Sequence, residues 1–223
     1  MHGLSNINYL KANFKSAWEN IKDIDEDSII DIVIEESKAG LNTLKFREEN
    51  AFKYVHSKYD PLKEAQSIVK KYEKELEKSG MAIFFGTGLG YHIELILRTY
   101  PDIKAYIYEP NSEVLYYFFK ERSFSEAQLK RFKNVFADRD SFLSEIGQII
   151  KLNRDSFTIV ELPAYMTIYP DEYEFFINAI KTIVRDRRSS ILTEYSFQKR
   201  WIINSMKNFK HVLNTPNVIV ENK

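Results

Sequence analysis

The spacing of apolar residues divides the first 60 residues into one helix followed by short strands. Over residues 8–23 apolar side chains recur every three or four positions, which predicts an amphipathic helix. Residues 29–36 and 41–47 alternate apolar and polar positions, as half-buried strands do, and a Lys-Ala-Gly turn separates them. A third short run covers residues 52–56. We therefore expect a subdomain over residues 1–60, in which a helix precedes a small antiparallel β-meander.

The pattern changes after residue 60, where short apolar runs begin to alternate with helical segments. Asp60 before Pro61 is typical of a helix start, and good helix formers fill residues 61–79. Expected strands cover residues 81–85, 103–109, 134–137 and 157–162, and expected helices cover 91–100, 111–122 and 141–152. Strands alternating with helices predict an α/β domain over residues 61–170, with a Rossmann-like, methyltransferase-like parallel sheet flanked by helices.

The remaining residues, 171–223, have no clear strand before the last few positions. Helical periodicity returns over residues 171–188 and 197–213, and residues 218–223 suit the start of a further strand. We expect C-terminal helices and a linker toward a further domain. An interaction module is one hypothesis for this region, because it is rich in aromatic side chains that suit a protein contact. They are Tyr173, Phe175, Phe176, Trp201 and Phe209.

Composition narrows the classes of partner and compartment. Lysine plus arginine equals aspartate plus glutamate at 32 each, which argues against a nucleic-acid binder. The chain has no cysteine, so disulfides and thiolate metal sites are excluded, and we expect no metal. No window approaches the roughly 18 apolar residues of a membrane helix. Residues 1–15 also lack an apolar signal core. We therefore expect a cytoplasmic protein with no membrane partner.

The most informative chemistry lies where the first buried strand ends. Gly86, Gly88 and Gly90 follow the apolar run 81–85, and a helix is expected directly after them. Such a turn exposes backbone amides and a positive helix end to an anion or a ribose. Glu109 ends the next strand, where an acid typically accepts hydrogen bonds from ribose hydroxyls. The expected ligand-binding residues are Gly86, Thr87, Gly88, Gly90, Glu109 and, at the end of the fourth strand, Glu161.

The sequence leaves the identity of a ligand at the glycine turn open. The Gly-x-Gly-x-Gly spacing is more typical of S-adenosylmethionine (SAM) methyltransferases than of dinucleotide sites, but Phe84 stands where those enzymes usually carry an acid. Three interpretations remain: the turn binds a nucleotide, it binds SAM, or it binds no ligand and has a packing role only. His92 either lies over the turn or is a surface or capping residue. No phosphate loop, nucleophile elbow or paired-histidine motif is present, so no catalytic residue is assigned.

Three segments together suggest a family. His56-Ser57-Lys58-Tyr59-Asp60-Pro61 reads best as a turn and helix cap, and it is followed by Phe84–His92 and by Tyr108-Glu109-Pro110. In this order and spacing they resemble the N-terminal region of motility accessory factor (Maf) proteins, which are bacterial flagellin glycosyltransferases. The resemblance covers about residues 29–217.

The resemblance carries expectations about function and partners. In that family the region precedes a central catalytic domain with a Gly-Pro-Ser motif, and this sequence lacks that motif. The implied role is an accessory domain for recognition, assembly or scaffolding in an enzyme that transfers a nonulosonic acid from a CMP-sugar to Ser or Thr of flagellin. The implied partners are flagellin and the catalytic domain, and a homo-oligomer is compatible with the sequence. No catalytic residue is carried over.

Overall fold

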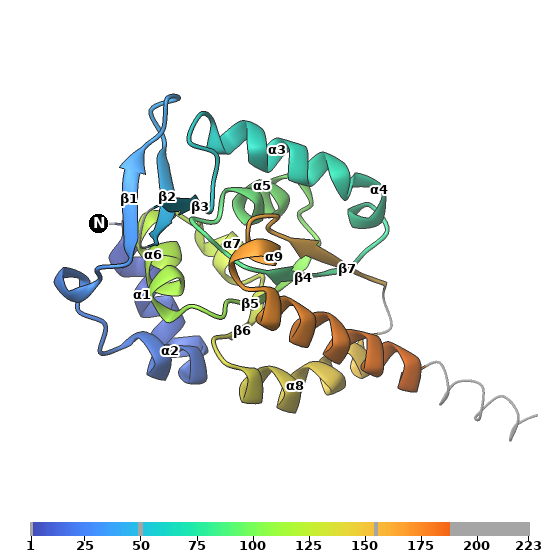
Figure 1. The fold of residues 1–223 in the computed structure, drawn as a ribbon. Coiled ribbons are helices and arrows are strands. Elements are labelled where there is room, and N and C mark those ends of the chain that lie inside the picture. The colour runs from blue at the N-terminus through green and yellow to red at the C-terminus, as the bar shows by residue number, and fades with distance from the viewer. Residues whose placement is uncertain (1, 49–50, 154–155, 188–223) are drawn as a thin grey trace, which may run out of the picture. The chain divides into compact units, whose positions relative to one another are not determined.

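The computed structural model of this chain describes residues 2–48, 51–153 and 156–187. The chain divides into two compact units, residues 1–179 and 180–223. The first unit contains both the β-meander and the parallel sheet (Figure 1). The boundaries expected at residues 60 and 170 stay predictions. Among the described residues, no helix is both long enough and apolar enough to cross a membrane.

The N-terminal segment forms two helices where one was predicted. Helix α1 (His2–Asn13) and helix α2 (Lys15–Ile21) are separated by Phe14, whose backbone is not helical (φ −130°, ψ 71°). The Phe14 side chain is buried, so the break turns an aromatic ring into the core. A short 3-10 turn (Glu26–Ser28) follows. It delays the first strand, and Ile30, which was expected on the strand's apolar face, is 68% exposed.

The predicted antiparallel meander is confirmed. Strands β1 (Ile32–Glu36), β2 (Asn42–Arg47) and β3 (Phe52–Tyr54) pair in the order β1-β2-β3. Directly after β3, Val55 and His56 are buried while Lys58 and Tyr59 are exposed. Thr43 of β2 donates its hydroxyl hydrogen to the His56 carbonyl at 2.9 Å. The meander therefore fixes the backbone from which His56 reaches inward.

The second sheet is parallel, as predicted, and four-stranded. Its strands are β4 (Met81–Phe85), β5 (Lys104–Tyr108), β6 (Phe132–Phe136) and β7 (Phe157–Glu161), in the order β6-β5-β4-β7. Counted along this sheet the order is 3-2-1-4, which matches the first four strands of a Rossmann fold. Every residue of the central strand β4 is buried, which explains its unbroken apolar run. Phe85 lies in register with Tyr108 on one side and Glu161 on the other, so the three strands end together.

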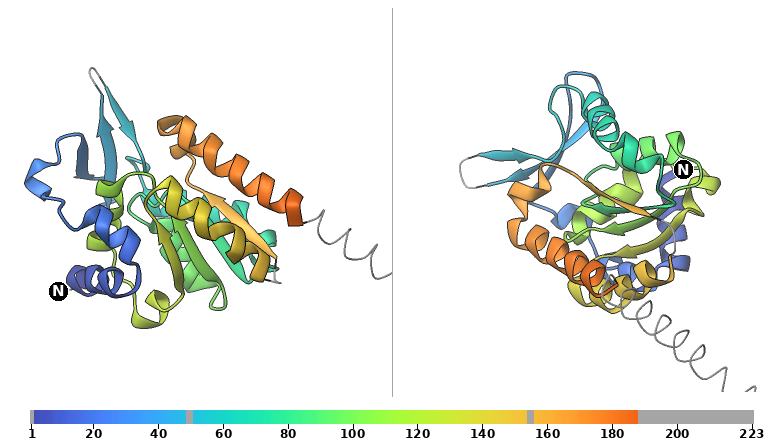
Figure 2. Two further views of the ribbon diagram at one scale, coloured as in Figure 1. Left: turned by 90° about the horizontal axis from the view of Figure 1, so that it is seen from below. Right: turned by 90° about the vertical axis from the view of Figure 1, so that its right-hand side faces the viewer.

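Helices flank this sheet and join its strands (Figures 1 and 2). Asp60 caps α3 (Pro61–Lys71) by accepting from the amides of Leu62 and Lys63, as the sequence predicts. The expected helix over residues 61–79 is interrupted before α4 (Glu73–Leu76). The other connecting helices are α5 (Tyr91–Thr99), α6 (Ser112–Glu121), α7 (Glu126–Leu129) and α8 (Arg139–Leu152), and α9 (Tyr165–Ile168) follows the last strand. The four-residue helices α7 and α9 were not predicted, because one turn is too short to show periodicity.

The predicted helix after residue 170 is present, with residues 170–187 helical. Phe176 is fully buried, and its ring lies 5.0 Å from that of Phe85 and 5.3 Å from that of Phe142 on α8. This part of the expected contact surface therefore packs on the chain's own sheet. Trp201, Phe209 and the segments 197–213 and 218–223 lie outside the described residues.

Candidate functional site at the glycine turn

The predicted strand–turn–helix unit is present. Strand β4 ends at Phe85, the turn runs from Gly86 to Gly90, and α5 begins at Tyr91. All ten residues from 81 to 90 are buried. The turn lies beside the end of β5, because the Gly86 amide donates to the Tyr108 carbonyl at 2.9 Å. The predicted position of the turn, between a buried parallel strand and a helix and beside the end of the next strand, is therefore confirmed.

The Glu109 carboxylate faces this turn, as predicted, but it binds the turn directly. Its Oε2 accepts from the Thr87 amide at 2.7 Å, the Thr87 hydroxyl at 2.8 Å and the Tyr165 hydroxyl at 2.7 Å. Its Oε1 accepts from the Asn111 amide at 3.0 Å. The Glu109 side chain is fully buried. The acid that would accept from a ribose thus already has four donors from the protein itself.

Burial and hydrogen bonding act on this carboxyl in opposite directions. Burial is the larger effect on the pKa of Glu109, so although the donors from Thr87, Tyr165 and Asn111 lower this pKa, the net value is raised to about 7. Burial and the neighbouring carboxylate hold the pKa of Tyr165 well above its ordinary value. The Tyr165 hydroxyl therefore stays protonated across the physiological pH range and donates a hydrogen bond to Glu109.

The remaining amides of the turn also have acceptors within the protein. The Gly88 amide donates to the Tyr165 hydroxyl oxygen at 3.3 Å, and the Gly90 amide donates to the Thr87 carbonyl at 2.8 Å. The Leu89 amide donates to Nε2 of His56 at 2.7 Å. Each amide from Gly86 to Gly90 is therefore engaged, and the anion-binding capacity of such a turn is used internally.

The acceptor role of Nε2 fixes the tautomer of His56. Its proton must be on Nδ1, which lies 3.3 Å from Oε2 of Glu64 on α3. His56 therefore links the turn to the start of α3. The interpretation of the His56–Pro61 segment as a turn and helix cap is correct for Asp60 and incomplete for His56, whose ring serves the glycine turn instead.

Two of the glycines are needed because protein side chains occupy the space that a Cβ would take. Gly86 has φ +83°, and a Cβ there would lie 2.5 Å from Cδ1 of Tyr165. Gly88 has φ +48°, and a Cβ there would lie 2.3 Å from Nε2 of His56. In a nucleotide site such glycines make room for a phosphate or ribose. Here the same room holds Tyr165 and His56.

His92 lies inside the protein, so its interpretation as a surface or capping residue is wrong. The side chain is fully buried, with its ring centroid 5.9 Å from that of Phe84. Neither ring nitrogen has a hydrogen-bond partner among the described residues. Burial, with a smaller contribution from His56, lowers the pKa of His92 to about 3. The Gly86 backbone only partly opposes this shift, so the imidazole is neutral, and its burial costs stability.

Glu161 ends β7 at the same sheet edge as the turn, but other groups hold it. Its Oε1 accepts from the Tyr173 hydroxyl at 2.7 Å and its Oε2 from the Tyr72 hydroxyl at 3.2 Å. Burial and this carboxylate raise the pKa of Tyr173 to about 12. No hydrogen bond joins Glu161 to the turn among the described residues. Its expected place among the ligand-binding residues stays a prediction.

Within residues 2–48, 51–153 and 156–187, no group of three or more His, Asp or Glu side chains is placed to hold a metal ion. Sequence reasoning did not find the two side chains that fill the turn, Tyr165 and His56. Tyr165 follows Glu109 by 56 residues, and no local pattern connects the two.

The fold of this chain is similar to that of a known glycosyltransferase. The chain matches the solved structure of Maf glycosyltransferase from Magnetospirillum magneticum AMB-1 with a TM-score of 0.53 and 13% sequence identity. The match covers 81% of this chain but only 35% of that protein, and at this identity it shows the fold alone. No curated protein matches. Residues 9–120 match the family described as Glycosyltransferase Maf N-terminal domain, which is just over half of the chain. This chain therefore belongs to the Maf glycosyltransferase N-terminal domain family.

Proposed function

We propose that this chain is the accessory N-terminal domain of a Maf-type flagellin glycosyltransferase and that it serves recognition, assembly or scaffolding. In this proposal a separate catalytic domain transfers a nonulosonic acid from its CMP-activated form to Ser or Thr of flagellin. The partners of this chain are then flagellin and that catalytic domain. Family membership supports the parent enzyme class.

The observation that carries the accessory role is the internal use of the glycine turn. Its five amides, from Gly86 to Gly90, donate to groups of the protein, and Glu109 is buried beneath them with four donors. A nucleotide or SAM would have to displace Tyr165 and His56 and leave their buried polar groups without partners. Each such group would cost about 1–3 kcal/mol. This favours a structural turn over a cofactor site.

Titration calorimetry with SAM, CMP and NAD tests the turn directly. We expect no saturable heat with any of the three. Saturable binding of SAM that is lost in both Gly88→Arg and Glu109→Ala would overturn the proposal in favour of a methyltransferase or nucleotide-binding domain. Both variants need a check by circular dichroism, because both alter a buried turn.

A transfer assay tests the accessory role. These 223 residues, incubated with a CMP-activated nonulosonic acid and flagellin, should give no glycosylated flagellin by mass spectrometry. In a pull-down, the chain should retain flagellin or the separately expressed catalytic domain of its parent enzyme. Sugar transfer by this chain alone, or retention of neither protein, would contradict the proposal.

A further inference from the structure

Two side chains of the His56–Pro61 segment take no part in holding the glycine turn or in capping α3. His56 holds the glycine turn, the Ser57 hydroxyl accepts from the amides of Tyr59 and Asp60, and Asp60 caps α3. The side chains of Lys58 and Tyr59 make none of these contacts. Both residues are exposed, and Tyr59 is 54% accessible.

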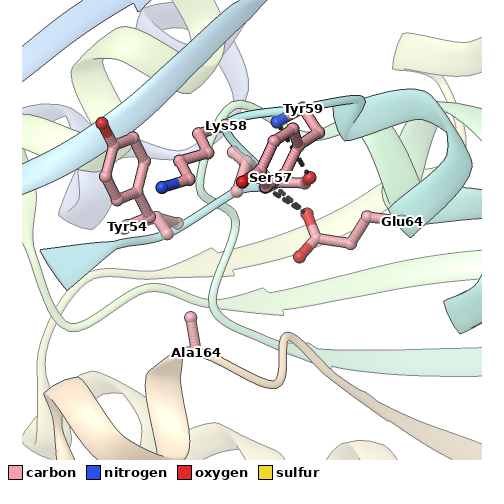
Figure 3. A pocket seen from close by; sticks show the side chains of 8 residues that line it. Tyr54, Ser57, Lys58, Tyr59, Glu64 and Ala164 are labelled. Carbon is pink, nitrogen blue, oxygen red and sulfur yellow. Dashed lines mark hydrogen bonds and ion pairs between the residues drawn. The ribbon is translucent and has the colours of Figure 1, made fainter. Parts of the chain in front are cut away.

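These two side chains line an open surface depression of about 300 Å³, which we call the Lys58 pocket. Its walls come from residues 54–59, from Glu64 on α3 and from Ala164 just before α9 (Figure 3). The volume is at the lower end of the range for small-molecule sites and suits a single ring-sized molecule.

One side of the pocket is cationic and aromatic. The Lys58 ammonium lies 5.3 Å from the ring centroid of Tyr59 and 6.0 Å from that of Tyr54. The Lys38 ammonium lies 4.7 Å from the same Tyr59 ring, and the Lys38 amide donates to the Lys58 carbonyl. Neither lysine has a carboxylate partner among the described residues. The Lys58 ammonium is thus an exposed cation at the pocket, and Lys38, which contacts the same Tyr59 ring from outside the pocket lining, adds positive charge nearby; both favour an anion there.

The other side of the pocket presents a hydrogen-bond acceptor. Glu64 lies away from the Lys58 ammonium (Figure 3), and its Oε2 accepts from the Ser57 amide at 3.1 Å and faces Nδ1 of His56. Its Oε1 has no hydrogen-bond partner among the described residues, and the side chain is 30% exposed. The negative charge disfavours an anion at this end, whereas a hydroxyl group can donate to it.

We propose that the Lys58 pocket binds a compact hydroxylated organic anion. Its carboxylate or phosphate lies at the ammonium group of Lys58, its ring lies against Tyr59 and Tyr54, and a hydroxyl donates to Oε1 of Glu64. Lysine acts as a point charge and does not select between carboxylate and phosphate. This binding site is separate from the glycine turn, and it does not depend on the accessory role proposed above.

Amide chemical-shift titration of the 223-residue chain tests the site with three probes. Glucuronate carries a carboxylate, glucose 6-phosphate carries a phosphate, and glucose is their neutral counterpart. We expect saturable shifts around residues 54–59 with at least one anion and much weaker ones with glucose. Binding of glucuronate would indicate a carboxylate ligand, and binding of glucose 6-phosphate would indicate a phosphate ligand. No saturable shift with either anion, or equal affinity for glucose, would overturn the proposal.

A pair of lysine variants shows whether binding occurs at this pocket. Lys58→Gln removes the charge and should weaken the anion that binds by about tenfold or more, as expected for a charged hydrogen bond. Lys74→Gln is the matched control, because Lys74 is also an exposed lysine but lies on α4 and does not line the pocket. Unchanged affinity in Lys58→Gln, or an equal loss in Lys74→Gln, would exclude the site.

Discussion

The glycine turn and the Lys58 pocket are adjacent in the fold but opposite in how their polar groups are used. Both involve the His56–Pro61 segment, whose His56 serves the turn while its Lys58 and Tyr59 face solvent. At the turn every amide and the Glu109 carboxylate have partners in the protein. At the pocket the Lys58 ammonium and one carboxylate oxygen of Glu64 have no hydrogen-bonding or charged partner among the described residues.

This contrast separates groups that stabilise a fold from groups that are available to a ligand. A polar group that is buried and fully hydrogen-bonded would need new partners before a ligand could use it. An exposed cation over an aromatic ring has no such requirement. Substitutions should therefore change stability strongly at the turn and barely at the pocket.

The largest effect should come from Glu109→Ala. Removing this carboxylate leaves the Thr87 amide and hydroxyl, the Tyr165 hydroxyl and the Asn111 amide without an acceptor in a buried site. We expect a loss of about 3–5 kcal/mol in the free energy of unfolding, measured by urea denaturation at pH 8. A loss below about 1 kcal/mol would mean that water reaches these donors and that the turn is not closed.

Gly88→Ala should be the next most severe. The residue has φ +48°, and the added Cβ would collide with the His56 ring that accepts from Leu89. We expect a loss of about 2–4 kcal/mol from the clash and the backbone strain together. Gly40→Ala is the matched control, since Gly40 has φ +75° but its nearest Cβ contact is 3.4 Å.

The control should lose only the strain of a left-handed alanine, about 1–2 kcal/mol. Differential scanning fluorimetry followed by urea denaturation compares the two variants. Equal losses at Gly88 and Gly40 would show that His56 does not fill the space beside Gly88, and the account of why this glycine is needed would fail.

The third prediction concerns pH and His92. The folded pKa is about 3 and the ordinary value is 6.5, so between these values the unfolded chain binds more protons and acid destabilises the fold. His92→Leu removes this proton uptake. The variant's advantage over the parent chain should grow by about 2 kcal/mol from pH 7 to pH 5.

The difference in unfolding free energy between the parent chain and His92→Leu reports on His92 alone, although Glu109 changes stability with pH in the opposite direction. Glu109 has a folded pKa raised to about 7, so its contribution to stability is complete below about pH 4.5 and declines as pH rises through 7. That contribution is present in both proteins and cancels in the difference. Urea denaturation of both proteins at several pH values measures this difference in unfolding free energy. A difference that does not change with pH would refute the assignment of a neutral, buried His92.

The sequence predicted where the glycine turn lies, but not which groups its amides bind. An all-apolar β4, three close glycines and an acid ending the next strand predicted a strand–turn–helix unit with Glu109 nearby. Whether the amides face a ligand depends on Tyr165 from α9 and on His56 from the meander. Those contacts form through packing between segments distant in the chain, and no local periodicity encodes them.

The smallest effect is expected for Lys58→Gln. The side chain is exposed and has no ion-pair partner among the described residues, so its removal should change the free energy of unfolding by no more than about 0.5 kcal/mol. The same variant should lose most of the anion binding proposed for the Lys58 pocket. Urea denaturation and shift titration on one preparation measure both quantities. A variant that is clearly destabilised would place Lys58 among the groups that hold the fold, and the contrast between the two regions would no longer hold.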